Sequence, residues 1–203
     1  MTLNKKIELA QAIQSNIGNH VASLWPGFSP VPFILYDAEN QVAVGSSWPE
    51  RYRREQDGIW IAEGTDPVLM GNTSIMYHGN CVAIWDTRTW EEPDVPRATS
   101  CLAHEMFHAF QNLHMELPYA NELLMPSYPH SPKSVALALE EGNLFTKMMT
   151  MHVSTEEICA CLTTIALLRK LRKKEIGAEY MEYDEHMEGI EGTAAYIEIM
   201  MPS

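Results

Sequence analysis

The sequence predicts an α+β fold, with strands gathered in its first half and helices in its second half. Residues 31–44 and 73–86 are rich in β-branched and aromatic side chains around turn-forming residues, which is typical of strands. Beyond them, apolar residues recur three and four positions apart, which is typical of amphipathic helices. The chain has 203 residues, 46% of them hydrophobic, enough for one folded core. We therefore expect a single domain over residues 1–203, made of a strand-rich lobe over about 28–97 and a mainly helical lobe over about 98–203.

A first helix is expected over residues 3–24, where apolar residues recur at helical spacing until Trp25-Pro26-Gly27 ends the pattern. The segment 46–66 is polar and is expected to be rich in loops. A capping box, Ser154 followed three residues later by Glu157, marks the start of one later helix. The helices of the second half are expected at about 100–114, 135–151, 154–174 and 178–200.

Composition excludes several functions. The net charge of −13 opposes binding to nucleic acid, and the basic run 169–174 is interpreted as a solvated helix end. No apolar stretch is long enough to span a bilayer, and polar residues interrupt the N-terminus where a secretory signal would need a continuous apolar region. Four cysteines without such a signal are expected to be free thiols. We therefore predict a cytoplasmic protein with neither nucleic acid nor membrane as partner.

The motif HExxH is formed by His104, Glu105 and His108 within a predicted helix. Residues four apart on a helix share a face, so both imidazoles can reach one metal ion. The glutamate beside the first histidine can take a proton from water at that ion. Imidazole and carboxylate ligands favour zinc, although they also suit manganese and iron.

A catalytic zinc ion needs a third protein ligand, and the last predicted helix offers Glu191. Gly189 and Gly192 flank it, and mid-helix glycines suggest close approach to a neighbouring helix. Glu188 and Glu198 lie one and two turns away on the same acidic stripe. Either could orient a ligand histidine through its other ring nitrogen, or could simply face solvent.

Two other sources of the third ligand stay open. His114 lies six residues after His108, as in the metzincin pattern HExxHxxGxxH, but Gln111 replaces the glycine that lets the chain turn back. On an unbroken helix His114 would point away from His108. Glu140 and Glu141, on an earlier helix, are a weaker source of a third carboxylate.

Two segments together resemble the gluzincin, or peptidase MA-like, side of the zincin metallopeptidases. They are HEMFHAFQ at 104–111 and EGIEGTAAYIE at 188–198, which contains the pattern E-G-x-A-x-Y from Glu191 to Tyr196. The resemblance implies His104, His108 and Glu191 as ligands of Zn²⁺ and Glu105 as catalytic base. It also implies a zincin-like fold, in which a small N-terminal β-sheet lies over the HExxH helix. An edge strand within 73–86 would then hold an extended peptide.

The expected function is hydrolysis of peptide bonds in a peptide or protein substrate by metal-activated water. Thermolysin-like enzymes carry an acidic residue four positions after the ligand glutamate, where this chain has Ala195. The donor to the oxyanion is also not defined by the sequence. A catalytically weak or inactive zinc- or peptide-binding module is therefore the alternative, and a metal-free helical structural protein is a third hypothesis. The candidate oxyanion donors are Tyr128, His130, His186 and Tyr196.

Overall fold

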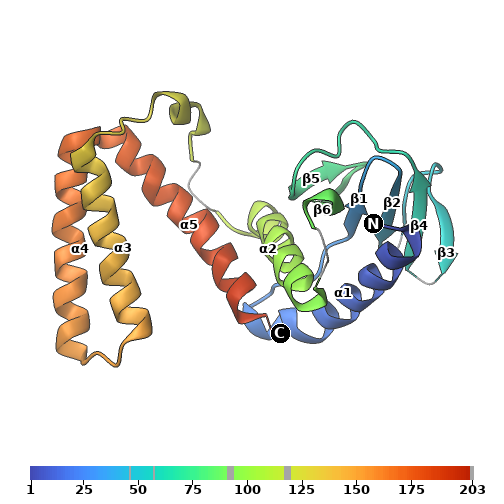
Figure 1. The fold of residues 1–203 in the computed structure, drawn as a ribbon, viewed down its shortest axis with the longest axis horizontal. Coiled ribbons are helices and arrows are strands. Elements are labelled where there is room, and N and C mark those ends of the chain that lie inside the picture. The colour runs from blue at the N-terminus through green and yellow to red at the C-terminus, as the bar shows by residue number, and fades with distance from the viewer. Residues whose placement is uncertain (46, 57, 91–93, 117–119, 202–203) are drawn as a thin grey trace. The chain divides into compact units, whose positions relative to one another are not determined.

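The computed structural model describes residues 1–45, 47–56, 58–90, 94–116 and 120–201. Its fold is α+β, with a six-stranded sheet followed by a mostly helical C-terminal half, as predicted (Figure 1). The chain divides into two compact units. The first unit comprises Met1–Leu117 and Ile190–Ser203, and the second comprises Pro118–Gly189. These boundaries differ from those of the predicted lobes, and the single domain stays a prediction.

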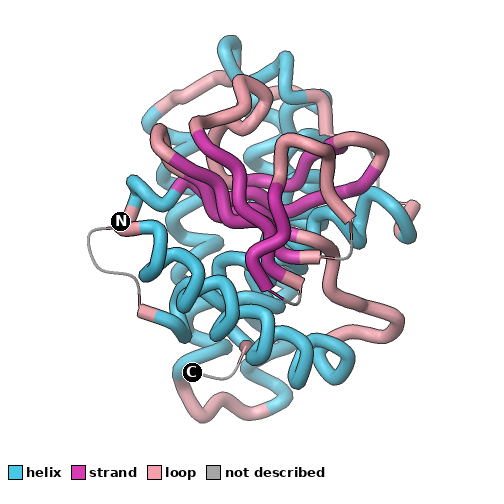
Figure 2. Tube along the Cα trace, turned by 90° about the vertical axis from the view of Figure 1, so that its right-hand side faces the viewer, coloured by secondary structure: helices cyan, strands magenta, loops and turns pink. Residues whose placement is uncertain are grey.

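The sheet belongs to the first unit and has the order β3-β4-β2-β1-β6-β5, with the twist that Figure 2 shows. Neighbouring strands are antiparallel except for the central pair β1 and β6, which is parallel. Strand β5 forms one edge of the sheet, as expected for the 73–86 segment. The strands are β1 (Phe33–Tyr36), β2 (Asn40–Val44), β3 (Arg53–Gln56), β4 (Ile59–Glu63), β5 (Thr73–Tyr77) and β6 (Asn80–Asp86).

Two helices of the first unit, α1 (Leu3–Leu24) and α2 (Val95–His114), pack against one face of the sheet. Strand alternation assigns Phe33 and Leu35 to this face, whereas Ile34 and Tyr36 point into a second apolar cluster on the other face. The last residues of α5 (Ala178–Met200) join the first cluster through buried apolar side chains. The main core therefore lies between the sheet, α1, α2 and the end of α5.

Local sequence explains most of these boundaries. The β5–β6 turn has positive φ at His78 (48°) and Gly79 (84°), the pair of conformations that a two-residue hairpin turn needs. Helix α2 begins at Val95, earlier than the expected position near residue 100, because Pro96 is tolerated in a first turn. The segment 46–66 was expected to be rich in loops, and the strands β3 and β4 within it were not predicted. All four residues of β3 are exposed, so it shows no alternating pattern.

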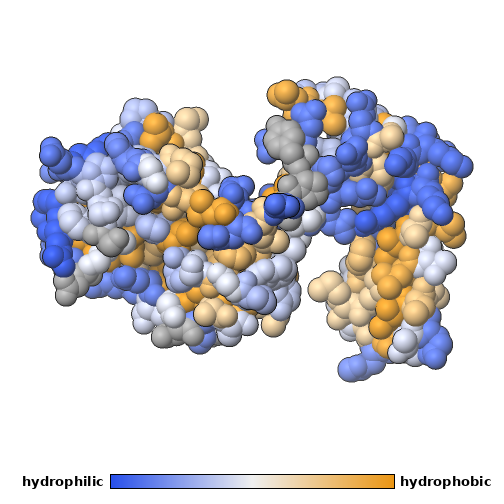
Figure 3. All heavy atoms as spheres, turned by 180° about the vertical axis from the view of Figure 1, so that it is seen from behind, coloured by the Kyte–Doolittle hydropathy of each residue, from blue (hydrophilic) through white to orange (hydrophobic). Residues whose placement is uncertain are grey.

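The second unit contains α3 (Pro132–Thr150), α4 (Thr155–Ile176), the short 3-10 helix Glu122–Ser127 and the first part of α5. Ion pairs join its helices: Arg169 contacts Glu141 at 2.6 Å and Glu188 at 2.7 Å, and Arg172 contacts Glu141 at 3.2 Å and also pairs with Asp184. Apolar side chains are exposed along α3 and α4 (Figure 3), among them Val135, Leu139, Met149, Leu162, Leu167 and Leu171.

None of the described helices combines the length and the apolar character that crossing a membrane requires. All four cysteines are free.

Candidate metal centre

Helix α2 carries the HExxH motif and separates a core face from a polar face. Ala103, Met106, Phe107 and Phe110 are buried in the main core, whereas Leu113 is 53% exposed. The rings of Phe107 and Phe110 stack against each other, and both contact Phe28. This packing fixes the rotation of α2 about its axis, so its histidines face away from the sheet core.

Three side chains from two helices converge at this polar face. The Nε2 atoms of His104 and His108 lie 3.0 Å apart. The Oε2 atom of Glu191, on α5, lies 3.5 Å from each of these nitrogens. Among the residues that the structure describes, this is the one group of three His, Cys, Asp or Glu side chains able to share an ion.

The spacing of these three atoms fits zinc. Tetrahedral zinc with bonds of about 2.0–2.1 Å to nitrogen and oxygen keeps its donor atoms about 3.3 Å apart. The measured separations of 3.0, 3.5 and 3.5 Å lie on either side of that value. The donor set, two imidazoles and one carboxylate, is also one that zinc favours.

Gln111 is a site residue that the sequence did not reveal. It is 2% exposed, and its Oε1 atom lies 2.8 Å from Nδ1 of His108. Its Nε2 donates to the carbonyl oxygen of Ile190 at 2.8 Å and to Oγ1 of Thr193 at 2.7 Å. A signal existed in the sequence, because Gln111 lies three residues after His108 and therefore on the same helical face.

Glu198 faces the first histidine. Its Oε2 atom lies 3.0 Å from Nδ1 of His104, a nitrogen that is buried and has no well-directed hydrogen bond to any described residue. The separation suits a hydrogen bond although the angle does not. Of the two carboxylates expected to orient a histidine, Glu198 is thus placed to do so, whereas Glu188 pairs with Arg169 in the second unit.

The hydrogen bonds of Gln111 determine which ring nitrogen of His108 faces His104. Because the carbonyl oxygen of Ile190 can only accept, the amide nitrogen of Gln111 must face it, and Oε1 then accepts a hydrogen bond from Nδ1–H of His108. Neutral His108 therefore presents the lone pair of Nε2 to His104 at 3.0 Å. His104 in turn presents Nδ1 to a carboxylate. A metal ion between the two rings would accept the Nε2 lone pairs of both histidines and leave Nδ1 of His104 to donate toward that carboxylate.

Negative charge accumulates around the same point. The pKa of Glu105 is raised to about 7, mainly by burial; the charge of His108 opposes the rise, and the charges of Glu191 and Glu198 contribute to it. Three carboxylates thus interact around two imidazoles, an environment that a cation would compensate.

Other predicted site residues lie elsewhere. His114 is exposed at the end of α2 and contacts the ring of Phe110, and it is not part of the cluster. Glu141 is bound to two arginines in the second unit. Close approach of helices does not require Gly192, because a Cβ atom there would meet no described atom within 4 Å; the same is found at Gly189.

The candidate oxyanion donors are dispersed between the units. Tyr128, His130 and His186 belong to the second unit, where the hydroxyl of Tyr128 donates to Asp184. Tyr196 belongs to the first unit, and its ring contacts Trp25.

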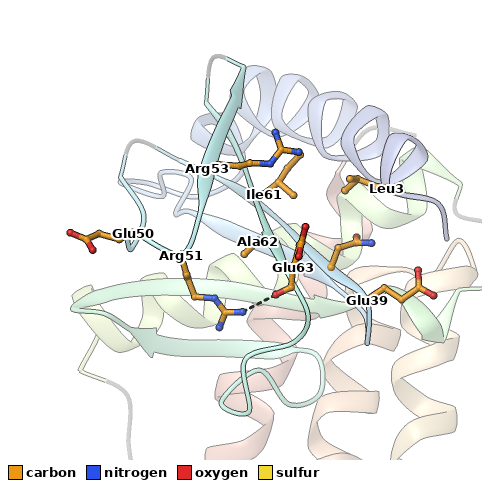
Figure 4. A pocket seen from close by; sticks show the side chains of 9 residues that line it. Leu3, Glu39, Glu50, Arg51, Arg53, Ile61, Ala62 and Glu63 are labelled. Carbon is orange, nitrogen blue, oxygen red and sulfur yellow. Dashed lines mark hydrogen bonds between the residues drawn. The ribbon is translucent and has the colours of Figure 1, made fainter.

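A hollow of about 720 Å³ in the first unit is lined by none of the candidate metal ligands (Figure 4). Its two arginines are already paired: Arg51 with Asp66 and with the carbonyl oxygen of Glu63, and Arg53 with Glu55. We assign no ligand to it.

Comparisons with protein-family models, with curated proteins and with solved structures find no match for this chain.

Proposed function

We propose that this chain is a zinc-dependent metallopeptidase of the gluzincin type with a zincin-like fold, and that it works in the cytoplasm. The observation that supports this most strongly is the convergence of His104, His108 and Glu191 at separations that match one tetrahedral zinc ion. Their residue types and spacing are those of the HExxH and E-G-x-A-x-Y motifs.

His104, His108 and Glu191 would hold the ion. When bound, zinc supplies Lewis acidity, which polarises a carbonyl oxygen and lowers the pKa of a water molecule. Glu198 and Gln111 would keep the ligand nitrogens of the histidines directed at the ion.

Glu105 is the proposed general base. It lies next to His104 on α2, and its charge interacts with those of His108, Glu191 and Glu198. A carboxylate at this point can accept a proton from the attacking water and return it to the leaving amine.

The substrate is proposed to be a peptide or protein in extended form. Strand β5 forms a sheet edge and lies beside α2, the helix that carries the motif. An extended peptide can add to such an edge by main-chain hydrogen bonds, which give affinity without requiring a particular sequence.

A zinc- or peptide-binding module without useful activity is the alternative. The sequence motivates it, because hydrolysis needs a donor at the developing negative charge and the sequence does not define that donor. The metal-free helical protein has less support, since the six-stranded sheet rules out an all-helical fold.

The test begins with metal analysis of protein purified without chelator, for which we expect zinc near one equivalent. Glu105→Gln should then retain zinc and lose cleavage of a peptide library that the wild type cleaves. Full activity of that variant would refute the mechanism. Zinc binding without any cleavage by the wild type would favour the alternative, and absence of zinc after reconstitution would refute both metal-based hypotheses.

A further inference from the structure

Gln111 is a buried residue whose side-chain amide makes several hydrogen bonds. It is buried on α2, yet its amide uses one oxygen and one nitrogen to bond three partners: a ring nitrogen of His108, a backbone carbonyl of α5 and a hydroxyl of α5. The partners on α5, Ile190 and Thr193, lie one residue before and two residues after Glu191. The side chain of Gln111 therefore contacts the candidate ligand His108 directly. It also bonds to α5 on both sides, in the sequence, of the candidate ligand Glu191.

The first consequence concerns the tautomer of His108. The carbonyl oxygen of Ile190 holds the amide nitrogen of Gln111 toward α5, so Oε1 must face His108. A proton on Nδ1 satisfies that oxygen and leaves Nε2 bare toward His104 and Glu191. A metal ion needs that bare nitrogen, and a histidine in water prefers the opposite tautomer.

The second consequence concerns the register of α5 against α2. Two bonds of 2.8 and 2.7 Å fix Gln111 to α5 on both sides of Glu191 in the sequence. A shift of α5 by one residue along its axis, about 1.5 Å, would break both. The same bonds thus hold the carboxylate of Glu191 within 3.5 Å of both ring nitrogens before any ion arrives.

We propose that Gln111 is a positioning residue of the metal centre, which sets the ring nitrogen that His108 presents and fixes the register of α5 that places Glu191. This inference rests on the proposed metal-dependent function for its purpose. The tautomer of His108 and the register of α5 are properties of the metal-free chain and are tested in it.

The experiment compares the wild type with Gln111→Leu by ring ¹⁵N NMR of histidine-labelled, metal-free protein at mildly alkaline pH. In the wild type we expect His108 to carry its proton on Nδ1. In Gln111→Leu the proton should move to Nε2, and zinc affinity, measured by chelator competition, should fall about 10–100-fold. Gln111→Glu retains an acceptor oxygen and should keep the wild-type tautomer.

A double-mutant cycle tests the register. Combined with Glu191→Gln, the Gln111→Leu change should reduce zinc affinity less than it does alone, because part of its effect acts through Glu191. The matched control is Asn112→Leu, an exposed neighbour on the same helix, which should change neither the tautomer nor the affinity. Thermal unfolding confirms that each variant folds, and Gln111→Met, closer in length, takes the place of the leucine variant if that does not.

A wild-type His108 with its proton on Nε2 would overturn the proposal, and so would unchanged tautomer and affinity in the folded leucine or methionine variant. If the wild type shows the Nδ1 proton but binds no zinc, the proposed function fails while the positions assigned to Gln111 stand.

Discussion

Glu198 lies 3.0 Å from Nδ1 of His104, while Nε2 of the same ring lies 3.0 Å from His108. The imidazole therefore bridges a carboxylate and the candidate metal position. Carboxylate partners of this kind orient ligand histidines and increase their basicity. Glu198 lies seven residues after Glu191, at a position the gluzincin resemblance does not supply, since Ala195 occupies the expected place.

Replacing Glu198 with glutamine should lower zinc affinity about 10–100-fold, because the ring of His104 loses its charged partner. Chelator competition measures the change. Glu188→Gln is the matched control, since Glu188 lies on the same helix but pairs with Arg169, and it should bind zinc like the wild type. Equal losses in both variants would contradict an orienting role for Glu198.

The third ligand can be identified by substitution. Glu191→Ala should reduce zinc affinity by more than about 100-fold, beyond the range for residues that only support ligands. His114→Ala should leave it unchanged, because His114 is exposed and outside the cluster. Zinc titration of both variants distinguishes the gluzincin from the metzincin arrangement, and the reverse ranking would require the latter.

The buried pair Lys6 and Asp37 should make stability fall in acid. Nζ of Lys6 lies 2.7 Å from Oδ2 of Asp37. Burial alone would raise the pKa of Asp37, but Lys6 and the amides of Asn40 and Glu39 outweigh it and hold the pKa below its usual value. The stabilisation is thus complete above the unfolded-state pKa of about 3.9 and is lost as the pH falls through the lower folded-state pKa.

Asp37→Asn should reduce the free energy of unfolding at neutral pH by about 3–5 kcal/mol, because it leaves a buried ammonium group unpaired. It should also flatten the loss of stability below about pH 4. Denaturant unfolding across that range measures both effects. Glu39→Gln, at an exposed neighbour, is the control. If the stability of Asp37→Asn fell as steeply in acid as that of the wild type, other carboxyl groups would be the cause of the fall.

Glu141 should be the carboxylate on which the second unit most depends. It is 6% exposed and accepts hydrogen bonds from both Arg169 and Arg172. Glu141→Ala leaves two guanidinium groups short of a partner and should lower stability by about 3–5 kcal/mol. Glu140→Ala, at the exposed residue beside it, should have little effect. Thermal melts of the two variants provide the comparison, and similar melting temperatures would refute the role of Glu141.

Much of the fold was predictable because its signals are local. Helical spacing within residues 3–24 located α1 to the residue, and strand-forming side chains located strands within 73–86, where β5 and β6 lie. Strand β3 was not predictable, because a strand exposed on both faces carries no alternation of polar and apolar residues. The two compact units carry no local signal in the sequence, since they depend on contacts between the end of α5 and a core formed much earlier in the chain.

The candidate site was likewise predictable from local sequence signals but not from contacts between distant residues. His104 and His108 were predictable because four-residue spacing alone places them on one helical face. Glu191 could be proposed from its motif, and the structure brings it to both histidines. The bonds from Gln111 to Ile190 and Thr193 join residues about eighty positions apart, and no periodicity within either helix specifies such a pairing.

The first unit is assembled from two separate stretches of chain, with the whole second unit between them in the sequence. His104 and His108 belong to the first stretch and Glu191 to the second. An ion bound to all three would be a cross-link that closes the intervening chain into a long loop. Such a cross-link restricts the unfolded chain most when the loop is long. The proposed ion would then serve as a removable counterpart of a disulfide, in a chain whose own cysteines are all free.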